Sequence, residues 1–236
     1  MDSETMRDAI GHVRSGIESA CARAGRDPSE VLLVAVTKTV SLDVIRQARL
    51  MGLDHFGENY ATELAAKAAQ LQATWHFIGR LQRGTAHRVA DHAQVVHSAE
   101  PGRALQRLAR RASSEGRSIR CLIQTDFTGG RQGVPPEETP GAVQAFAAVE
   151  GIALVGLMTL PPWTDDPEAT RPYFARLREL RDRIHPRHPE VVELSMGMSG
   201  DYEVAVEEGA TMLRIGTALF GSRPRTPGGA TPDEEG

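Results

Sequence analysis

Short apolar runs alternate with helix-like segments along almost the whole chain. Ile10, Val13 and Ile17 recur at helical spacing and predict a first helix over about 4–24, which Gly25 ends. Eight later runs predict strands at 31–38, 54–57, 75–78, 94–98, 119–127, 152–160, 191–196 and 212–215. The segments between the strands predict helices at 41–51, 60–72, 79–90, 102–115, 137–149, a long one ending near 184, and 201–208.

This alternation predicts an α/β fold, a single (β/α)8 TIM barrel with an extra N-terminal helix. A chain of 236 residues fits the usual size of that barrel, roughly 250 residues. The short second and third strands leave an open, doubly wound sheet as the alternative. We expect the barrel to occupy residues 1–222, and the tail at 223–236, rich in Pro, Gly and charge, to be disordered.

A closed barrel would place the first and last predicted strands side by side, about 5 Å apart. Because side chains alternate along a strand, Val36 and Lys38 share one face of the first strand. Met212, Arg214 and Gly216 likewise share one face of the last strand. A cation therefore ends an apolar row on each of two neighbouring strands.

Lysine accounts for only two of the 27 basic residues, Lys38 and Lys67. Lys67 lies in a helix-like AAKAAQ segment, where we expect a solvated cation. Lys38 ends a buried strand, where an unpaired charge is costly. Lysine can lose its proton and form a Schiff base, and arginine can do neither. We therefore favour a Schiff-base lysine at Lys38 over a side chain that merely extends to solvent.

Two loops of the predicted barrel are suited to binding a phosphate. Gly197-Met198-Ser199-Gly200 follows the seventh strand, and Gly216-Thr217 follows the eighth and opens a last helical turn. In TIM barrels phosphate commonly binds at these two loops, where backbone N–H groups are exposed. A phosphate at this position, a flat ring beside Arg214 and an aldehyde at Lys38 together describe pyridoxal 5'-phosphate (PLP). An arginine donor would leave the pyridine nitrogen unprotonated and damp carbanion chemistry; the alternative for Arg214 is a strand-end ion pair.

Charge, hydropathy and cysteine content exclude several classes of protein. A net charge of −4 and a pI near 6.1 give no electrostatic case for nucleic acid. No apolar run approaches membrane-spanning length, and the N-terminus carries no signal-like apolar segment. Two cysteines form no disulfide framework, and no HExxH motif suggests a metal site. We expect a soluble, cytoplasmic monomer without bound metal.

Six motifs occur in order at family-typical spacing: AVTKT, HFGENY, WHFIGRLQ, GLMTLP, LSMGMSGD and RIGTALFG. Over about residues 31–222 the chain resembles the PLP homeostasis proteins, the YggS/PROSC family. The resemblance implies a barrel of the alanine racemase N-terminal type, PLP fold type III. It implies a covalent PLP Schiff base on Lys38, and the further cofactor contacts are Asn59, Met198, Ser199, Arg214, Gly216 and Thr217. His76 of WHFIG lies near the implied pocket, but a lone histidine on an apolar strand is more typical of a satisfied core residue.

The chain departs from the family where accessory lysines usually stand. Val40 stands where the family often has a second lysine after the first motif, and Arg131 replaces one after the fifth strand. Arg83-Gly84-Thr85 follows LQ where the family commonly has SNK. If those lysines help to pass PLP on, that step is altered in this protein. The primary PLP site is complete.

The resemblance implies a protein that carries or buffers PLP in vitamin B6 and amino-acid homeostasis, without catalysis. Apo PLP-dependent enzymes are the implied recipients. A PLP-dependent amino-acid racemase or lyase is the first alternative, and turnover of an amino acid would establish it. Tyr202 follows the phosphate loop, but we interpret it as a helix-surface residue. A Schiff-base aldolase using Lys38 without PLP is the second alternative, and a borohydride-trapped sugar adduct would favour it.

Overall fold

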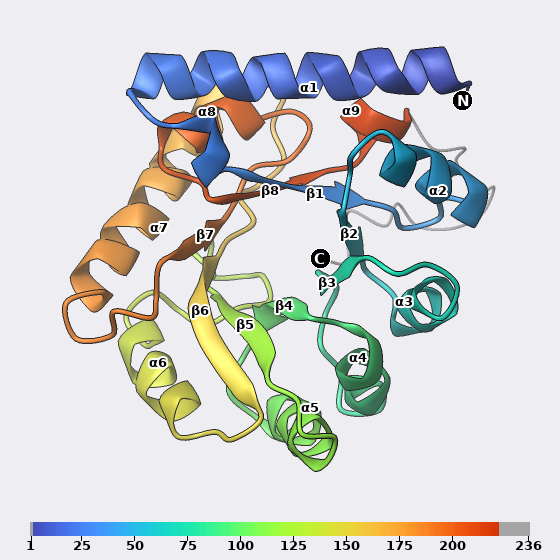
Figure 1. The fold of residues 1–236 in the computed structure, drawn as a ribbon. Coiled ribbons are helices and arrows are strands. Elements are labelled where there is room, and N and C mark those ends of the chain that lie inside the picture. Colours follow the sequence, from blue (N-terminus) through green and yellow to red (C-terminus); the bar gives the residue numbers. More distant parts are fainter. Residues whose placement is uncertain (1, 222–236) are drawn as a thin grey trace.

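A computed structural model describes residues 2–221, which form a closed barrel of eight parallel strands in sequential order (Figure 1). The strands are β1 Leu32–Val36, β2 His55–Glu58, β3 Thr74–Phe77, β4 Val95–Ala99, β5 Ile119–Gln124, β6 Ile152–Met158, β7 Glu193–Ser195 and β8 Met212–Ile215. Closure is made by β1 pairing with β8, with Leu32 opposite Met212 and Val34 opposite Arg214. The predicted barrel is confirmed, and the open-sheet alternative is wrong.

Helices surround the barrel and connect successive strands (Figure 1). The α-helices are α1 Ser3–Ala24, α2 Leu42–Leu50, α3 Ala61–Ala68, α4 Ala86–His92, α5 Arg103–Ser114, α6 Thr139–Ala147, α7 Arg171–Ile184, α8 Tyr202–Glu207 and α9 Thr217–Phe220. Two short 3-10 helices, η1 Pro28–Glu30 and η2 Pro167–Thr170, precede β1 and α7. The extra helix α1 lies across α8 and α9, on the side where β1 meets β8 (Figure 1).

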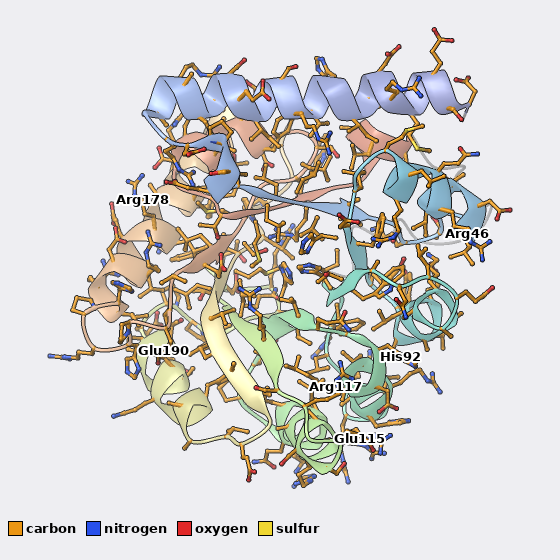
Figure 2. All side chains as sticks on the ribbon, in the orientation of Figure 1. Arg46, His92, Glu115, Arg117, Arg178 and Glu190 are labelled. Carbon is orange, nitrogen blue, oxygen red and sulfur yellow. The ribbon has the colours of Figure 1, made fainter. Side chains whose placement is uncertain are left out.

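Apolar side chains fill two separate regions. A large cluster lies between the strands and the helices, and it includes Phe56, Trp75, Phe77 and Phe174. A small cluster of Val95, Leu122, Met158 and Met212 is distinct from it, with Leu32 packed against it. Charged side chains such as Arg46, Glu115 and Arg178 lie around the outside of the helical ring (Figure 2). The strands are thus buried on both faces, as parallel sheets require.

Element boundaries differ from the predictions mainly at strand ends. β1 ends at Val36, two residues before Lys38, so the lysine lies in a turn and not on the strand itself. β5 and β7 are also shorter than predicted. The segment predicted to be a disordered tail, 223–236, lies outside the described residues.

Candidate functional site

Lys38 follows β1 in a turn at the carboxyl end of the barrel, where TIM-barrel active sites lie. Its side chain is half-buried. The neighbouring strand β8 ends at Ile215, which pairs with Ala35 of β1. Lys38 and Gly216 therefore follow adjacent parallel strands at the same end of the barrel. Closure of the barrel was predicted to place the ends of these two strands side by side.

Lys67 is not the solvated cation that its sequence context predicts. Only 8% of the residue is exposed, and its Nζ donates to Glu58 Oε1 at 2.8 Å and to Glu63 Oε2 at 2.7 Å. The third proton goes to the backbone oxygen of Thr37 at 2.7 Å. An ammonium group has three donors, so all of them are used. The second lysine is thus a buried structural group joined to the residue before Lys38.

The turn that carries Lys38 is held on both sides by this ion-pair group. Thr37 donates its hydroxyl to Glu58 Oε1 at 2.5 Å, and the Thr39 N–H donates to Glu63 Oε2 at 2.9 Å. Thr39 has a φ of 63°, and it is the one non-glycine residue with positive φ in the described part of the chain. That conformation costs a β-branched residue about 1–2 kcal/mol, so surrounding contacts must impose it. The strain lies directly beside the predicted Schiff-base lysine.

Burial and the ion pairs move the carboxylate pKa values in opposite directions. Burial raises the pKa of Glu58, although Lys67 and the Thr37 hydroxyl oppose the change. Burial also acts to raise the pKa of Glu63, but the Lys67 ammonium and the Thr39 N–H outweigh it and the pKa is lowered. Glu58 is therefore the member of the group that depends most on Lys67 for its charge.

The two predicted phosphate loops are in direct contact. Ser199 Oγ accepts the backbone N–H of Gly216 at 3.3 Å and that of Ala218 at 3.1 Å. Thr217 is exposed beside them, and Met198 is 36% exposed. Gly197 has a φ of 89°, and a Cβ there would come within 3.0 Å of Leu213. The loop after β7 can therefore approach β8 closely only with glycine at this position.

Arg214 is buried in the middle of β8, with 3% of the residue exposed. Its Nη1 donates to Ser195 Oγ at 2.6 Å, and its Nη2 donates to the backbone oxygen of Thr159 at 3.0 Å. Both partners are neutral oxygens, unlike the strand-end ion pair that we weighed. Burial lowers the pKa of the guanidinium to about 10, with Asp201 opposing that effect, so Arg214 is charged at neutral pH.

Asn59 follows β2 at the same end of the barrel. Its Oδ1 is buried and has no hydrogen-bond partner among the described residues. The backbone at Asn59 lies so close to Gly79 that a Cβ on Gly79 would collide with the Asn59 carbonyl. A buried oxygen without a hydrogen-bond partner is uncommon in native proteins, so Asn59 Oδ1 is a candidate acceptor for a donor on a bound ligand.

His76 is not a lone histidine but the middle member of a hydrogen-bonded chain. Its Nε2 lies 3.0 Å from His55 Nδ1, and its Nδ1 lies 2.8 Å from His97 Nε2. His97 Nδ1 lies 2.7 Å from the same Ser195 oxygen that accepts from Arg214. Burial lowers the pKa of His76 to about 3 and that of His97 well below its ordinary value. Both are therefore neutral at physiological pH.

His55 is the outer end of this chain. It lines a cleft of about 420 Å³, together with Arg14 and Glu18 of α1. Burial lowers the pKa of His55, while Asp54 raises it and Arg120 lowers it further. The sequence interpretation missed His55 and His97, although the three histidines recur 21 residues apart, once in each of three successive strands.

Tyr202 was expected on a helix surface and is instead buried, with 7% exposed. Its hydroxyl lies against α1, where a Cβ on Gly16 would collide with it. The ring is thus part of the contact between α8 and α1.

Arg131, in place of an accessory lysine, donates from Nη1 to the Pro161 oxygen at 3.1 Å.

Neither a metal site nor a membrane span is found within residues 2–221. No group of three or more His, Cys, Asp or Glu there could hold a metal ion. No helix of that part is both long and apolar enough to cross a membrane. Cys21 and Cys121 are both buried free thiols.

Known proteins resemble this chain over nearly its whole length. Residues 11–224 match the family described as "Alanine racemase, N-terminal domain". The "Pyridoxal phosphate homeostasis protein" of Aquifex aeolicus is 38% identical over 222 residues, covering 92% of this chain and 97% of that protein. Its namesake from Pseudomonas aeruginosa is 39% identical over 224 residues, covering 93% and 96%. The solved structure of PipY from Synechococcus elongatus PCC7942, with PLP bound, has a TM-score of 0.81 and 32% identity, covering 92% of this chain and all of that one.

Proposed function

This chain belongs to the alanine racemase N-terminal domain family and to the PLP homeostasis proteins, and on that premise we propose that it binds PLP through Lys38. The observation that carries the proposal is the arrangement at the carboxyl end of β1 and β8. There the Lys38 turn and the Ser199–Gly216 contact follow neighbouring strands. Bound PLP supplies an aldehyde for an amine, an aromatic nitrogen and a phosphate dianion.

The residues present fit each part of that cofactor. Lys38 offers a primary amine, and the loops around Ser199 offer the Ser199 hydroxyl and the backbone N–H of Thr217. The Gly216 N–H, which donates to Ser199 Oγ, lies beside them. Asn59 offers a buried oxygen that lacks a partner among the described residues. Arg214 uses two of its five N–H donors on Ser195 and Thr159, so donors remain for a ring nitrogen. Met198 would line the edge of the pocket.

We infer a carrier and buffer of PLP with no reaction of its own. An arginine donor, unlike a carboxylate, does not protonate a pyridine nitrogen, and this disfavours carbanion chemistry. Tyr202, a candidate general acid by its position in the chain, has its hydroxyl packed against α1. We further propose apo PLP-dependent enzymes as recipients. A monomeric state and a cytoplasmic location stay predictions.

A borohydride experiment tests this function. The purified protein is mixed with PLP, its visible spectrum is recorded, and the complex is reduced with borohydride and mapped by peptide mass. We expect a yellow complex with the label on Lys38. The matched variants are Lys38→Arg, which keeps the charge but cannot form an imine, and Lys67→Arg. Label lost only in Lys38→Arg supports the proposal.

Two results would overturn the proposal in different ways. A label on Lys67, or no label with PLP but a trapped sugar phosphate, would favour the aldolase alternative. Steady racemisation or cleavage of an amino acid by the PLP-loaded protein would favour the racemase or lyase alternative. Transfer to an apo-enzyme, followed by its regained activity, then measures delivery.

A further inference from the structure

A chain of side chains crosses the interior of the barrel from one end to the other. The strand register explains its course: Thr74 lies opposite His55 and Val95 lies opposite His76, so each histidine stands two residues farther along its strand than the one before. Because side chains alternate between the two faces of a strand, a step of two residues leads to the next side chain on the same face. The three rings therefore climb one layer per strand, from the cleft beside α1 towards the carboxyl end. There His97 meets Ser195, the last residue of β7.

Arg214 fixes the direction of every hydrogen bond in this chain. A guanidinium can only donate, so Ser195 Oγ is the acceptor in that pair. The serine hydrogen then has His97 Nδ1 as its acceptor at 2.7 Å. The hydrogen of neutral His97 must consequently be on Nε2, which donates to His76 Nδ1. The same reasoning places the His76 hydrogen on Nε2, which donates to His55 Nδ1.

The opposite donor–acceptor direction is unfavourable because it leaves the buried Ser195 hydroxyl hydrogen without an acceptor. If His97 Nδ1 donated, Ser195 Oγ would accept twice, and its own hydrogen would have no acceptor among the contacts of the described residues. Because Ser195 is fully buried, water cannot accept that hydrogen in place of a protein group, and the lost hydrogen bond costs stability. A chain locked in one direction does not conduct protons. It does make the serine a stronger acceptor, because a hydroxyl that donates binds an incoming donor more tightly.

We propose that His97, His76 and His55 are positioning residues that orient the Ser195 hydroxyl and, through it, the Arg214 guanidinium for the ring of a bound cofactor. The inference rests on the proposed function only for the identity of that ring. The hydrogen-bonded side chains hold the Arg214 guanidinium through Ser195, and the guanidinium is the charged group at their end because His76 and His97 are neutral. The two groups that hold the guanidinium, the Ser195 hydroxyl and the Thr159 carbonyl, are neutral oxygens, and its remaining donors are left for the ring.

Imidazole nitrogen NMR of the protein without PLP tests the chain by itself. We expect His76 and His97 to be neutral, with the hydrogen on Nε2, at every pH between about 5 and 8. His12, which is exposed on α1, is the surface reference in the same spectra. An Nδ1–H tautomer or an imidazolium at His97 would overturn the assigned direction. This result does not depend on whether PLP binds.

Variants then test the link to the cofactor. Ser195→Ala and His97→Leu each break the chain, and we expect about tenfold weaker PLP binding and a shifted absorption maximum in both. His97→Gln retains a donor and an acceptor, and it should restore most of both properties. His12→Gln is the matched surface control and should behave as the parent. If both chain-breaking variants fold, by circular dichroism, and keep the parent's affinity and spectrum, the positioning role is wrong.

Discussion

Replacing Lys67 with methionine tests the buried ion-pair group under the Lys38 turn. The substitution keeps the length of the side chain and removes its charge, leaving Glu58 and Glu63 without their shared ammonium. Removing one partner of a buried pair costs about 3–5 kcal/mol. The Glu63 side chain is 30% exposed and can be hydrated, whereas that of Glu58 is fully buried and cannot. We therefore expect the free energy of unfolding to fall by about 3 kcal/mol, chiefly through Glu58.

The loss of stability in Lys67→Met should depend on pH, because a protonated Glu58 is neutral and no longer carries a buried, unpaired charge. Burial already raises the pKa of Glu58 in the folded protein, and Lys67 is one of the groups that lower it. Removing Lys67 raises the folded-state pKa further, while the unfolded value stays near about 4.3. The folded variant then binds the proton more tightly than the unfolded chain. Its stability is consequently highest at low pH and declines as pH rises from about 4.3 through the folded-state pKa.

Urea unfolding at about pH 5 and pH 8 measures both effects. The double variant Glu58→Gln with Lys67→Met removes the orphaned charge and should recover most of the stability at pH 8. Arg46→Met breaks an exposed pair with Asp43 on the outer surface (Figure 2), and as the control it should change stability by less than about 1 kcal/mol. The reasoning is refuted if Lys67→Met matches the parent at pH 8, or if the double variant is no more stable than Lys67→Met alone.

Two further predictions concern the phosphate loops and the thiols. Ser199→Ala or Thr217→Val should weaken PLP retention in equilibrium dialysis about tenfold, because each removes a hydroxyl near the backbone N–H groups of Gly216 and Ala218. Unchanged retention in both variants would remove the proposed phosphate site, and thermal unfolding checks that each still folds. Burial raises the pKa of both Cys21 and Cys121, so neither thiol should react with a thiol reagent at pH 8 until denaturant is added. Rapid reaction of either one in the folded protein would contradict their buried placement.

The fold could be predicted from sequence because its signals are local and repeated. Each strand is a short apolar run and each helix has its own period, so eight repeats reinforce one another. The pairing of β1 with β8 followed from closure alone. Strand ends were harder to predict, since Lys38 has the same face parity as Val34 and Val36 but lies in the turn after β1. There the ion pairs with α3 decide the backbone course, and they join residues distant in sequence.

The site was predictable where motifs identify it and not where burial depends on partners from other elements. AAKAAQ reads as a solvated helix, and nothing local indicates that Glu58 and the Thr37 carbonyl face Lys67. Tyr202 was misplaced for the same reason, because the covering surface comes from α1 at the other end of the chain. The histidine chain had a readable signal in its 21-residue spacing. To use that signal one must also know the stagger between neighbouring strands of the barrel, because the stagger brings histidines of equal sequence spacing into contact.

The scarcity of lysine has a consequence for selectivity once Lys67 is seen to be buried. An aldehyde condenses with any accessible primary amine, so a lysine-rich surface would capture PLP at many sites. Across residues 2–221 the only lysines are Lys38 and Lys67, and Lys67 spends all three of its protons on internal acceptors. Arginine supplies the surface cations, such as Arg23, Arg111 and Arg171, and its guanidinium forms no imine. Under the function proposed above, an aldehyde in solution would therefore form its Schiff base with Lys38 and not with Lys67.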